Sequence, residues 1–203
     1  KLSGGNNDFD FNVDEFVNRV NTLLCNNIGN FVNRFATFVN KSFDGIISEV
    51  APNAEIVEKC LKAESDFFDS IVKTNNYRVA TETLQELGFL ANKYFQDNEP
   101  WKLMKSGEGT EDFAKAQEVM TTCAYFVRSL GTLLKPIVPV ITTRIEAVLQ
   151  EQFSFSDTRE GLGGRKLGPI EKVALPLEVE MFDELYKSDD AAPAKEEPKE
   201  GLS

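Results

Sequence analysis

The sequence predicts an all-α fold, an antiparallel helix bundle with an irregular C-terminal strap and a disordered acidic tail. Three observations support this fold class. Between residues 12 and 150, apolar side chains recur at steps of three and four, the spacing of one face of a helix. Residues that cap or break helices, mainly Asn, Thr, Gly and Pro, separate these stretches. The chain has 203 residues, 41% of them hydrophobic, which is enough to bury one continuous core.

The first predicted helix begins after Asn12 and ends at Gly45, which suits a left-handed helix cap. The Asn12 side chain can accept a hydrogen bond from the first turn, while Glu15 can reach back as in a capping box. The spacing predicts one unbroken α-helix of about eight turns with a single buried face. That face consists of Val17, Val20, Leu24, Ile28, Phe31, Phe35 and Phe38.

Two further helices are predicted over residues 54–73 and 77–96. The core side of the first should carry Ile56, Val57, Leu61, Phe67, Phe68, Ile71 and Val72. Its solvated side should carry Glu55, Glu58, Glu64, Asp66 and Asp69. The second begins at the capping residue Asn76, and Gly88 in its middle predicts close packing against another helix. Its core side should carry Val79, Leu84, Leu87, Leu90, Ala91 and Tyr94.

Prolines and a threonine delimit the remaining helices. Pro100 can begin a short helical turn, and Trp101 follows at once. Thr110 caps a fourth predicted helix, which ends at Pro136. A fifth begins near Pro139 and completes the bundle.

The prediction divides the chain into one domain and a tail. The domain covers residues 1–187, with the bundle core over about residues 12–150. Residues 151–187 are rich in Gly, Pro and scattered bases and should form the strap, with a short helix near residues 177–186. Residues 188–203 lack apolar side chains to bury, so we expect a disordered acidic tail or linker.

Composition argues against most enzyme chemistry within this chain. There is no histidine, so the usual general base and the commonest metal ligand are both missing. The three cysteines, Cys25, Cys60 and Cys123, lie far apart in apolar stretches, which is typical of reduced and buried thiols. We therefore predict no catalytic residue, no metal site and no cofactor in these 203 residues.

The charge and hydropathy of the chain limit its partners. A formal net charge of −11 opposes binding to a polyanion, so any nucleic-acid contact must be a local patch. No apolar run is long enough to span a bilayer, and the first residues are too polar for a signal peptide. We expect a cytoplasmic protein without membrane contact.

One polar feature on the first predicted helix needs an explanation. Asn26, Asn30 and Arg34 recur every four residues, so in an α-helix they would lie on one face beside the apolar stripe. Amide and guanidinium groups there could bind the edge of a flat partner. A hydrated helix face is the alternative interpretation, and the spacing leaves both open.

A second polar feature surrounds the only tryptophan, Trp101, which lies in a connection between helices. Lys93, Lys102 and Lys105 are close to it in the sequence. An indole in this setting could stack on an unpaired base while the lysines contact phosphates. It could also fold back into the core, and the sequence alone leaves this open.

Three blocks of sequence resemble the C-terminal anticodon-binding domain of methionyl-tRNA synthetases, especially the cytosolic eukaryotic ones. The first block covers residues 26–45, and the third covers residues 133–149. The second block covers residues 91–105 and holds the family's pattern of Asn, any residue, Tyr and then Pro-Trp. In this chain that pattern is Asn92, Tyr94, Pro100 and Trp101.

The resemblance implies a helix bundle of the class I synthetase type that reads the methionine anticodon in an unpaired loop. The family's reading residues match Asn30, Arg34 and Trp101, with Trp101 stacked on the wobble cytosine and the other two on its edge. Asn26, Lys93, Lys102 and Lys105 would supply supporting tRNA contacts. Further partners would be the catalytic domain of the same synthetase and an appended domain or multi-synthetase assembly reached through the tail.

The resemblance also separates this chain from the activity of a complete synthetase. The family's HIGH and KMSKS signatures, its nucleotide-binding fold and its zinc knuckle have no counterpart in the 203 residues. The parent protein would be an ATP- and Mg-dependent, AMP-forming methionine-tRNA ligase, which this segment alone could not be. Two alternatives compete: an acidic helical protein-protein interaction module, favoured by the net charge, and the bundle of another class I synthetase, disfavoured by the Pro-Trp pair.

Overall fold

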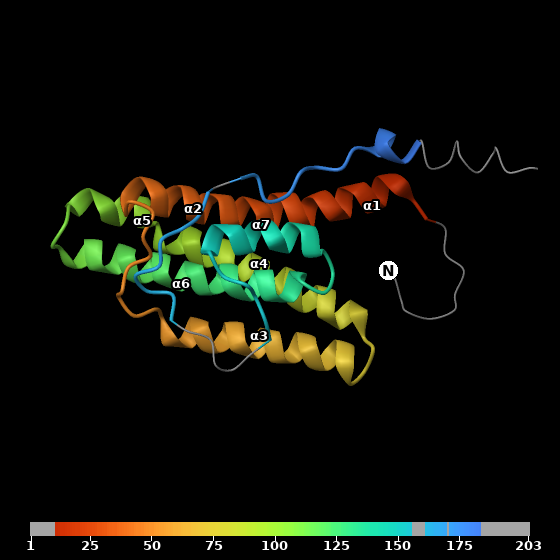
Figure 1. The fold of residues 1–203 in the computed structure, drawn as a ribbon, viewed down its shortest axis with the longest axis horizontal. Helices are drawn as coiled ribbons and strands as arrows, with labels where there is room; N and C mark the ends of the chain where they lie inside the picture. Colours follow the sequence, from red (N-terminus) through yellow and green to blue (C-terminus); the bar gives the residue numbers. More distant parts are fainter. Residues whose placement is uncertain (1–10, 156–160, 170, 184–203) are drawn as a thin grey trace, which may run out of the picture.

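The computed structural model describes residues 11–155, 161–169 and 171–183, and these form a helix bundle, as the sequence predicts. One long helix, built of three segments, lies along the bundle, and the other helices pack beside it (Figure 1). A single antiparallel bridge joins Ile46 to Lys166. The elements are α1 (Val13–Val20), η1 (Asn21–Gly29), α2 (Asn30–Ser42), α3 (Ala54–Val72), α4 (Tyr77–Asn98), α5 (Pro100–Leu103), η2 (Met104–Ser106), α6 (Glu111–Leu134), α7 (Pro139–Leu149) and η3 (Val179–Phe182).

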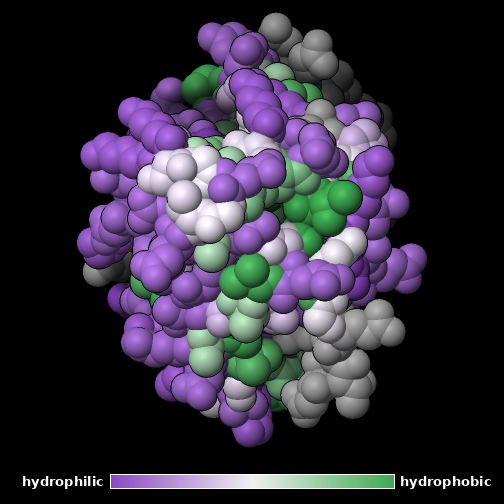
Figure 2. Space-filling model, turned by 90° about the vertical axis from the view of Figure 1, so that its left-hand side faces the viewer, coloured by the Kyte–Doolittle hydropathy of each residue, from purple (hydrophilic) through white to green (hydrophobic). Residues whose placement is uncertain are grey.

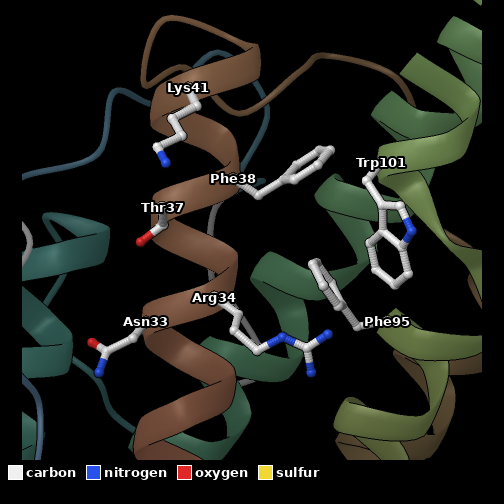
Figure 3. A pocket seen from close by; sticks show the side chains of 7 residues that line it. All are labelled: Asn33, Arg34, Thr37, Phe38, Lys41, Phe95 and Trp101. Carbon is white, nitrogen blue, oxygen red and sulfur yellow. The ribbon is translucent and has the colours of Figure 1, made fainter. Parts of the chain in front are cut away.

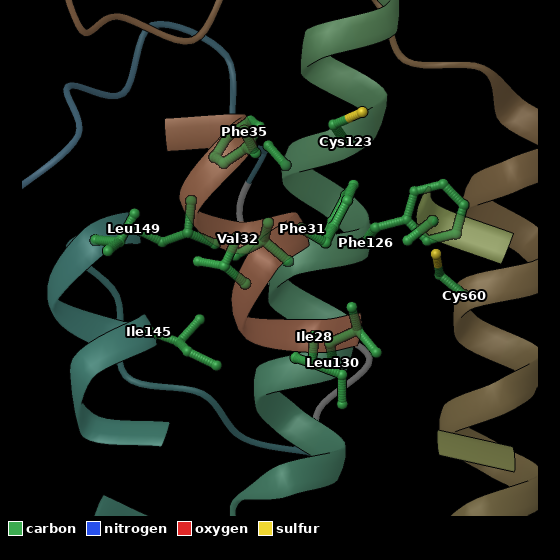
Figure 4. Packing of buried hydrophobic residues seen from close by; sticks show 14 of the residues in the cluster. Ile28, Phe31, Val32, Phe35, Cys60, Cys123, Phe126, Leu130, Ile145 and Leu149 are labelled. Atoms are coloured by element: carbon green, nitrogen blue, oxygen red, sulfur yellow. The ribbon is translucent and has the colours of Figure 1, made fainter. Parts of the chain in front are cut away.

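Helix α6 is the most buried element, and it contacts α2, α3, α4, α5 and α7. Its apolar side chains meet those of the first helix and α7 in one layer (Figure 4). Phe31 of α2 and Phe126 of α6 are both fully buried and meet edge to face, with ring centroids 6.1 Å apart. Each fully buried side chain of this size stabilises the fold by about 1.5–3 kcal/mol.

The helix caps that the sequence predicts are present. The side chains of Asn12, Asn76 and Thr110 accept hydrogen bonds from backbone N–H groups three residues on, at 2.9, 3.1 and 3.2 Å. The capping box is incomplete, however. Glu15 does not return to the cap residue, because its carboxylate accepts hydrogen bonds from Arg19, one helical turn further along.

The first helix is not the unbroken α-helix that the apolar spacing predicts. Its middle segment, η1, is a π-helix, in which backbone bonds reach back five residues instead of four. The apolar spacing does not reveal these turns, because a polar residue, Asn27, lies buried in this segment and its side-chain oxygen accepts a hydrogen bond from Asn92 of α4. The four-residue repeat of Asn30 and Arg34 holds within α2, whereas Asn26 belongs to the wider π turns.

Helix α3 is rotated relative to the prediction. Leu61, Phe68 and Val72, expected in the core, are 49%, 44% and 61% exposed, while Glu64, expected in water, is 5% exposed. The physical reason is a hydrogen bond from the Ser129 hydroxyl of α6 to the Glu64 carboxylate, at 2.5 Å. The residues that face inward are Ile56, Cys60, Glu64, Phe67 and Ser70. On α4, Val79 is likewise exposed instead of buried.

Burial disfavours the ionised form of a thiol and of a phenol in the core. Cys60 and Cys123 are buried and form no disulfide, as their apolar settings predict, whereas Cys25 is only half-buried. Burial raises the pKa of the Cys123 thiol well above its usual range. Burial likewise raises the pKa of Tyr94 to about 12. Within the described residues, no helix is both long and apolar enough to cross a membrane.

An irregular segment after α7 crosses the bundle and is tied to it by backbone hydrogen bonds. Gly164 donates to the Ile47 carbonyl at 2.8 Å, and Gly168 donates to the Val148 carbonyl at 2.9 Å. The Glu151 carboxylate accepts from both Arg128 and Arg165, at 2.8 and 2.9 Å. These bonds connect the ends of α2 and α7 through residues 161–168.

The chain then runs back along the first helix (Figure 1). The Asn21 side chain donates to the Leu177 carbonyl and accepts from the Leu177 N–H, both at 2.8 Å. The sequence predicts a helix over residues 177–186; in its described part, up to residue 183, the structure has the short 3-10 helix η3, and residues 184–186 lie outside the described residues. The tail over residues 188–203 lies outside the described residues, and the proposed domain division stays a prediction.

Replacing Gly168 with Ala should destabilise the fold. A Cβ at this position would lie 2.1 Å from the Ala147 carbonyl oxygen and 2.3 Å from the Gln150 amide, so the backbone must shift. Overpacking of this kind costs about 1–3 kcal/mol of unfolding free energy, measurable by chemical denaturation. Gly161→Ala is the matched control, because a Cβ there meets nothing within 4 Å. Equal unfolding free energies for the two variants would contradict this account of the strap.

Candidate nucleic-acid interface

A pocket of about 400 Å³ lies between α2 and the corner where α4 meets α5. Figure 2 faces the end of the bundle that carries α5; hydrophilic residues cover most of this end, and hydrophobic ones gather near its centre. The lining side chains come from α2, α4 and α5 and include two cations and no acid. They are Asn33, Arg34, Thr37, Phe38, Lys41, Phe95 and Trp101.

A sharp turn between α4 and α5 places the indole of Trp101 beside this pocket. Helix α4 ends at Asn98, whose side-chain amide donates to the Tyr94 carbonyl at 2.8 Å. Glu99 then adopts a left-handed conformation (φ 41°, ψ 54°), and Pro100 begins α5. The Trp101 ring comes to lie 5.7 Å from the Phe95 ring, centroid to centroid, with 46° between their planes.

Trp101 combines the two roles that the sequence left open. It is half-buried and packs on the core cluster through Phe95, so one part of the indole has a structural function. It also lines the pocket, so another part faces the open space (Figure 3). The indole is therefore neither sealed inside the bundle nor a free side chain on its surface.

Arg34 reaches the same pocket from α2, as the sequence predicts. Its guanidinium carbon lies 4.6 Å from the centre of the Phe95 ring, within the range of a cation-π contact. Its Nη2 donates to the Gln96 side-chain oxygen at 3.2 Å. Figure 3 shows the guanidinium on one side of Phe95 and the indole of Trp101 beyond it. Phe95 thus joins the two predicted reading residues, which lie 67 positions apart in the sequence.

Asn30, the third predicted reading residue, is exposed on α2 and is not among the residues that line the pocket. It precedes Arg34 by one helical turn, so its amide lies beside the pocket instead of within it. The predicted contact between Asn30 and the base therefore stays a prediction.

Several residues that line the pocket from α2 and α4 were not predicted as site residues from the sequence. Asn33, Thr37 and Lys41 follow one another at steps of four on α2, and Figure 3 shows their side chains on the side of the helix away from Trp101. Phe95 of α4 was also missed. A usable signal existed, because Arg34, Phe38 and Lys41 follow the steps of four and three that mark one helix face.

The predicted supporting residues lie outside the pocket lining. Lys93 pairs with Asp97 at 2.7 Å and Lys102 pairs with Glu99 at 2.8 Å, so an acid on the same stretch of helix already balances each charge. Lys105 is exposed in η2, and Asn26 is exposed in η1. Exposed pairs of this kind are weak and can open, so the predicted tRNA contacts of these four residues stay predictions.

The two cations in the pocket differ from these paired lysines. Within the described ranges, neither Arg34 nor Lys41 has an acidic group in an ion pair, whereas six pairs join residues four apart along single helices. The pocket is therefore a locally positive site on an acidic chain. Over the same ranges, no group of three His, Cys, Asp or Glu side chains is placed to hold a metal ion.

Comparison with protein families gives two matches along the chain. Residues 48–162 match the family described as the anticodon binding domain of methionyl tRNA ligase. Residues 2–36, which include Asn30 and Arg34, match the family described as class I tRNA synthetases (M). The first match alone covers more than half of the 203 residues.

Individual relatives agree with the family matches. The chain is 31% identical over 195 residues to a methionine-tRNA ligase of Polaromonas sp., covering 95% of this chain and 28% of the relative. It is 30% identical over 189 residues to that of Methylibium petroleiphilum, covering 92% and 27%. The chain thus spans little more than a quarter of these relatives. Both organisms are bacteria, so the expected likeness to cytosolic eukaryotic enzymes is not supported.

Solved structures agree on the fold. The free form of Mycobacterium tuberculosis methionyl-tRNA synthetase superposes with a TM-score of 0.72 at 24% identity, covering 83% of this chain and 35% of that one. The same enzyme in complex with methionyl-adenylate superposes with a TM-score of 0.67 at 25% identity, covering 79% and 33%. With the matched residues and the helical architecture in agreement, the chain belongs to the family of methionyl-tRNA ligase anticodon-binding domains.

Proposed function

We propose that this chain binds the anticodon loop of a methionine tRNA and that its pocket receives one unpaired base. The observation that carries the proposal is a pocket that holds a half-buried indole, an arginine and a lysine, on a chain with a net charge of −11. Among the described residues, neither cation forms an ion pair with an acid. An acidic protein can bind RNA where its cations are concentrated and unpaired. The alternative of a protein-protein interaction module accounts for the net charge but not for this pocket.

In the proposed complex, the base stacks on Trp101 and its edge faces Arg34. Single-stranded bases stack readily on aromatic rings, and Trp101 is anchored for this by Phe95. A cytosine edge offers acceptors that the N–H groups of a guanidinium can satisfy. Asn30, one turn before Arg34, would contact the same base from the rim of the pocket.

The position of Arg34 favours recognition because its side chain is already held in place. Phe95 and Gln96 restrain the guanidinium in the free protein, so less conformational entropy is lost when a base binds. Lys41 lies about two turns beyond Arg34 along α2 and would contact a phosphate beside the bound base. Lys93 and Lys102 would add weaker contacts after their ion pairs open, and the exposed Lys105 would add another.

We further propose that the opposite end of the bundle faces the catalytic part of a methionine-tRNA ligase. At that end lie the α3–α4 and α6–α7 turns and the start of α1 (Figure 1). Val72, Tyr77, Ile137 and Val140, in or beside these turns, are 61%, 58%, 44% and 68% exposed. Exposed apolar groups gathered at one end are typical of an interface. In the full-length cytoplasmic enzyme, ATP and Mg²⁺ would bind in the catalytic part, and the tail would lead to any appended domain or assembly.

Replacing Arg34 with Ala should weaken binding of a methionine anticodon stem-loop by about 10- to 100-fold, the loss expected for one side chain that reads a base. Discrimination between a cytosine and a uracil at the wobble position should fall with it. Fluorescence anisotropy of a labelled stem-loop measures both. Arg78→Ala is the matched control, because Arg78 is exposed on α4 and pairs with Glu82, one helical turn further along. Unchanged affinity in the Arg34 variant would rule out the proposed reading role.

Trp101 allows a separate test of stacking. Trp101→Phe should keep most of the affinity for the stem-loop, whereas Trp101→Ala should lose about 1–3 kcal/mol of binding free energy, the value of one stacked base. The same anisotropy titration compares them, with thermal melts to confirm folding. If both variants bind as tightly as the original chain, the indole has only a packing role.

Lys41 should behave as a phosphate contact. Lys41→Ala should weaken cytosine and uracil stem-loops equally and reduce the slope of log affinity against log salt by about 0.7 to 1. Lys59→Ala is the control, because Lys59 is paired with Glu55 on α3. A change in base preference without a change in slope would place Lys41 on the base instead.

A further inference from the structure

The π-helical segment η1 ends at Gly29, immediately before the helix that carries the pocket arginine. π-helical turns are rare and often occur at functional sites. Their backbone bonds span five residues, so they change the rotational register of whatever helix follows. The direction in which α2 points its side chains therefore depends on the geometry of η1.

A buried pair of amide side chains holds η1 against α4. Asn27 is 6% exposed, and its side-chain oxygen accepts from Asn92 Nδ2 of α4 at 2.7 Å. The same Nδ2 lies 3.2 Å from the backbone carbonyl of Asn27 and 3.0 Å from that of Gly88. One amide nitrogen thus bridges the backbones of two helices, 65 residues apart in the sequence.

Two glycines shape the space around this pair. A Cβ at Gly88 would lie 2.8 Å from the Asn27 side-chain nitrogen, so α4 can approach η1 this closely only without a side chain there. A Cβ at Gly29 would lie 2.8 Å from the Leu24 carbonyl oxygen, five residues back, and 3.5 Å from the Cβ of Ala174. At both Gly29 and Gly88, the absence of a side chain leaves the room that the π-helical segment needs.

The pair connects directly to the proposed reading residues. The backbone N–H of Asn30 donates to the carbonyls of Asn27 and Cys25, and Asn92 binds the first of these carbonyls. About one turn further along α4, Phe95 and Gln96 contact Arg34. Helix α4 therefore holds the first helix at two successive levels, the π segment and the pocket.

We infer that Asn27 and Asn92, packed on Gly88, form a positioning clamp that sets the rotational register of α2 and so directs Arg34 onto Phe95 beside Trp101. Its consequence for RNA binding rests on the proposed function. The free energy of folding alone does not explain why two asparagines are buried here. Within the described residues, the Asn27 side-chain nitrogen is buried without a hydrogen-bond partner, which lowers stability. An apolar pair of the same size would avoid that penalty but would not specify the register.

The inference can be tested first without RNA, in the intact 203-residue chain. Protons of the Arg34 side chain above Phe95 are shielded by the ring and should show shifted NMR resonances. Asn92→Asp keeps the shape of residue 92 but replaces the donor with an oxygen that faces three acceptor oxygens, so the clamp should open. Gly88→Ala should also open the clamp, because the added Cβ would press against the Asn27 side chain. In both variants the Arg34 resonances should move toward their values in an unstructured peptide.

A matched control separates the clamp from general destabilisation. Asn53→Ala removes another half-buried asparagine, the N-cap of α3, whose side chain accepts from Ile56 N–H at 3.1 Å. This variant should melt at a lower temperature yet keep the Arg34 resonances unchanged. Arg34 resonances that stay in place in folded Asn92→Asp and Gly88→Ala proteins would overturn the clamp, whatever the RNA measurements give.

The RNA measurement then distinguishes this inference from the proposed function. Asn92→Asp and Gly88→Ala should weaken stem-loop binding by about tenfold, approaching the effect of removing Arg34, while Asn53→Ala should not. If the Arg34 variant loses affinity but the clamp variants keep it, the clamp is overturned and the proposed function stands. If the original chain binds no stem-loop, the proposed function fails, and the Arg34 resonances still decide whether the clamp exists.

Discussion

The contact between the first helix and α6 is the constraint on which the rest of the structure depends. Phe31 and Phe126 meet at the centre of the core, where neighbouring side chains of both helices are fully buried. Close-packed interiors tolerate little displacement, so this contact fixes the position of α2 relative to α6 along the bundle. The side chains that α2 presents to α4 and α5 then follow from its rotation. Arg34 directly precedes the buried Phe35, so the same packing that encloses one residue places its neighbour at the pocket.

The distribution of charge explains how an acidic chain can carry a locally positive site. Along α1, α3 and α4, basic residues pair with acids about one turn away, and these pairs cancel at short range. At the pocket, Arg34 instead contacts an aromatic ring and a neutral amide. These contacts hold the Arg34 guanidinium in position, but neither carries a negative charge that would neutralise it. Net charge therefore describes the surface as a whole, whereas the charge at one site depends on the cations that have no acid beside them.

Polar groups inside the bundle specify geometry that apolar packing would leave open. The bond between Ser129 and Glu64 sets the rotation of α3, and the bonds of Asn92 to Asn27 set the position of η1 on α4. Apolar contacts are non-directional, so several rotations of a helix can bury similar areas. A buried polar group must meet a particular partner, and it excludes the rotations that separate them. Both pairs lie near α6 or α4, where the helices approach one another most closely.

By itself, the sequence determined the features that depend on neighbouring residues. The helix caps at Asn12, Asn76 and Thr110 are examples, because each cap bonds to an N–H group three residues away. The turn at Pro100 follows from proline's fixed backbone angle, and so does the placement of Trp101 on an inter-helix corner. The resemblance to a known family added Arg34 and Trp101 as a functional pair, and the fold brings both to one pocket.

Only the tertiary structure decided the π segment, the rotation of α3 and the full set of pocket residues. The π turns depend on a bond between residues 65 positions apart, and the burial of Glu64 depends on a hydroxyl equally distant. Lys41 shares a helix face with Arg34, but Phe95 joins them in the pocket only because α4 and α2 meet there. Spacing along one helix predicts which residues share a face, but the partner that covers this face, and the rotation it imposes, arise only when the helices pack.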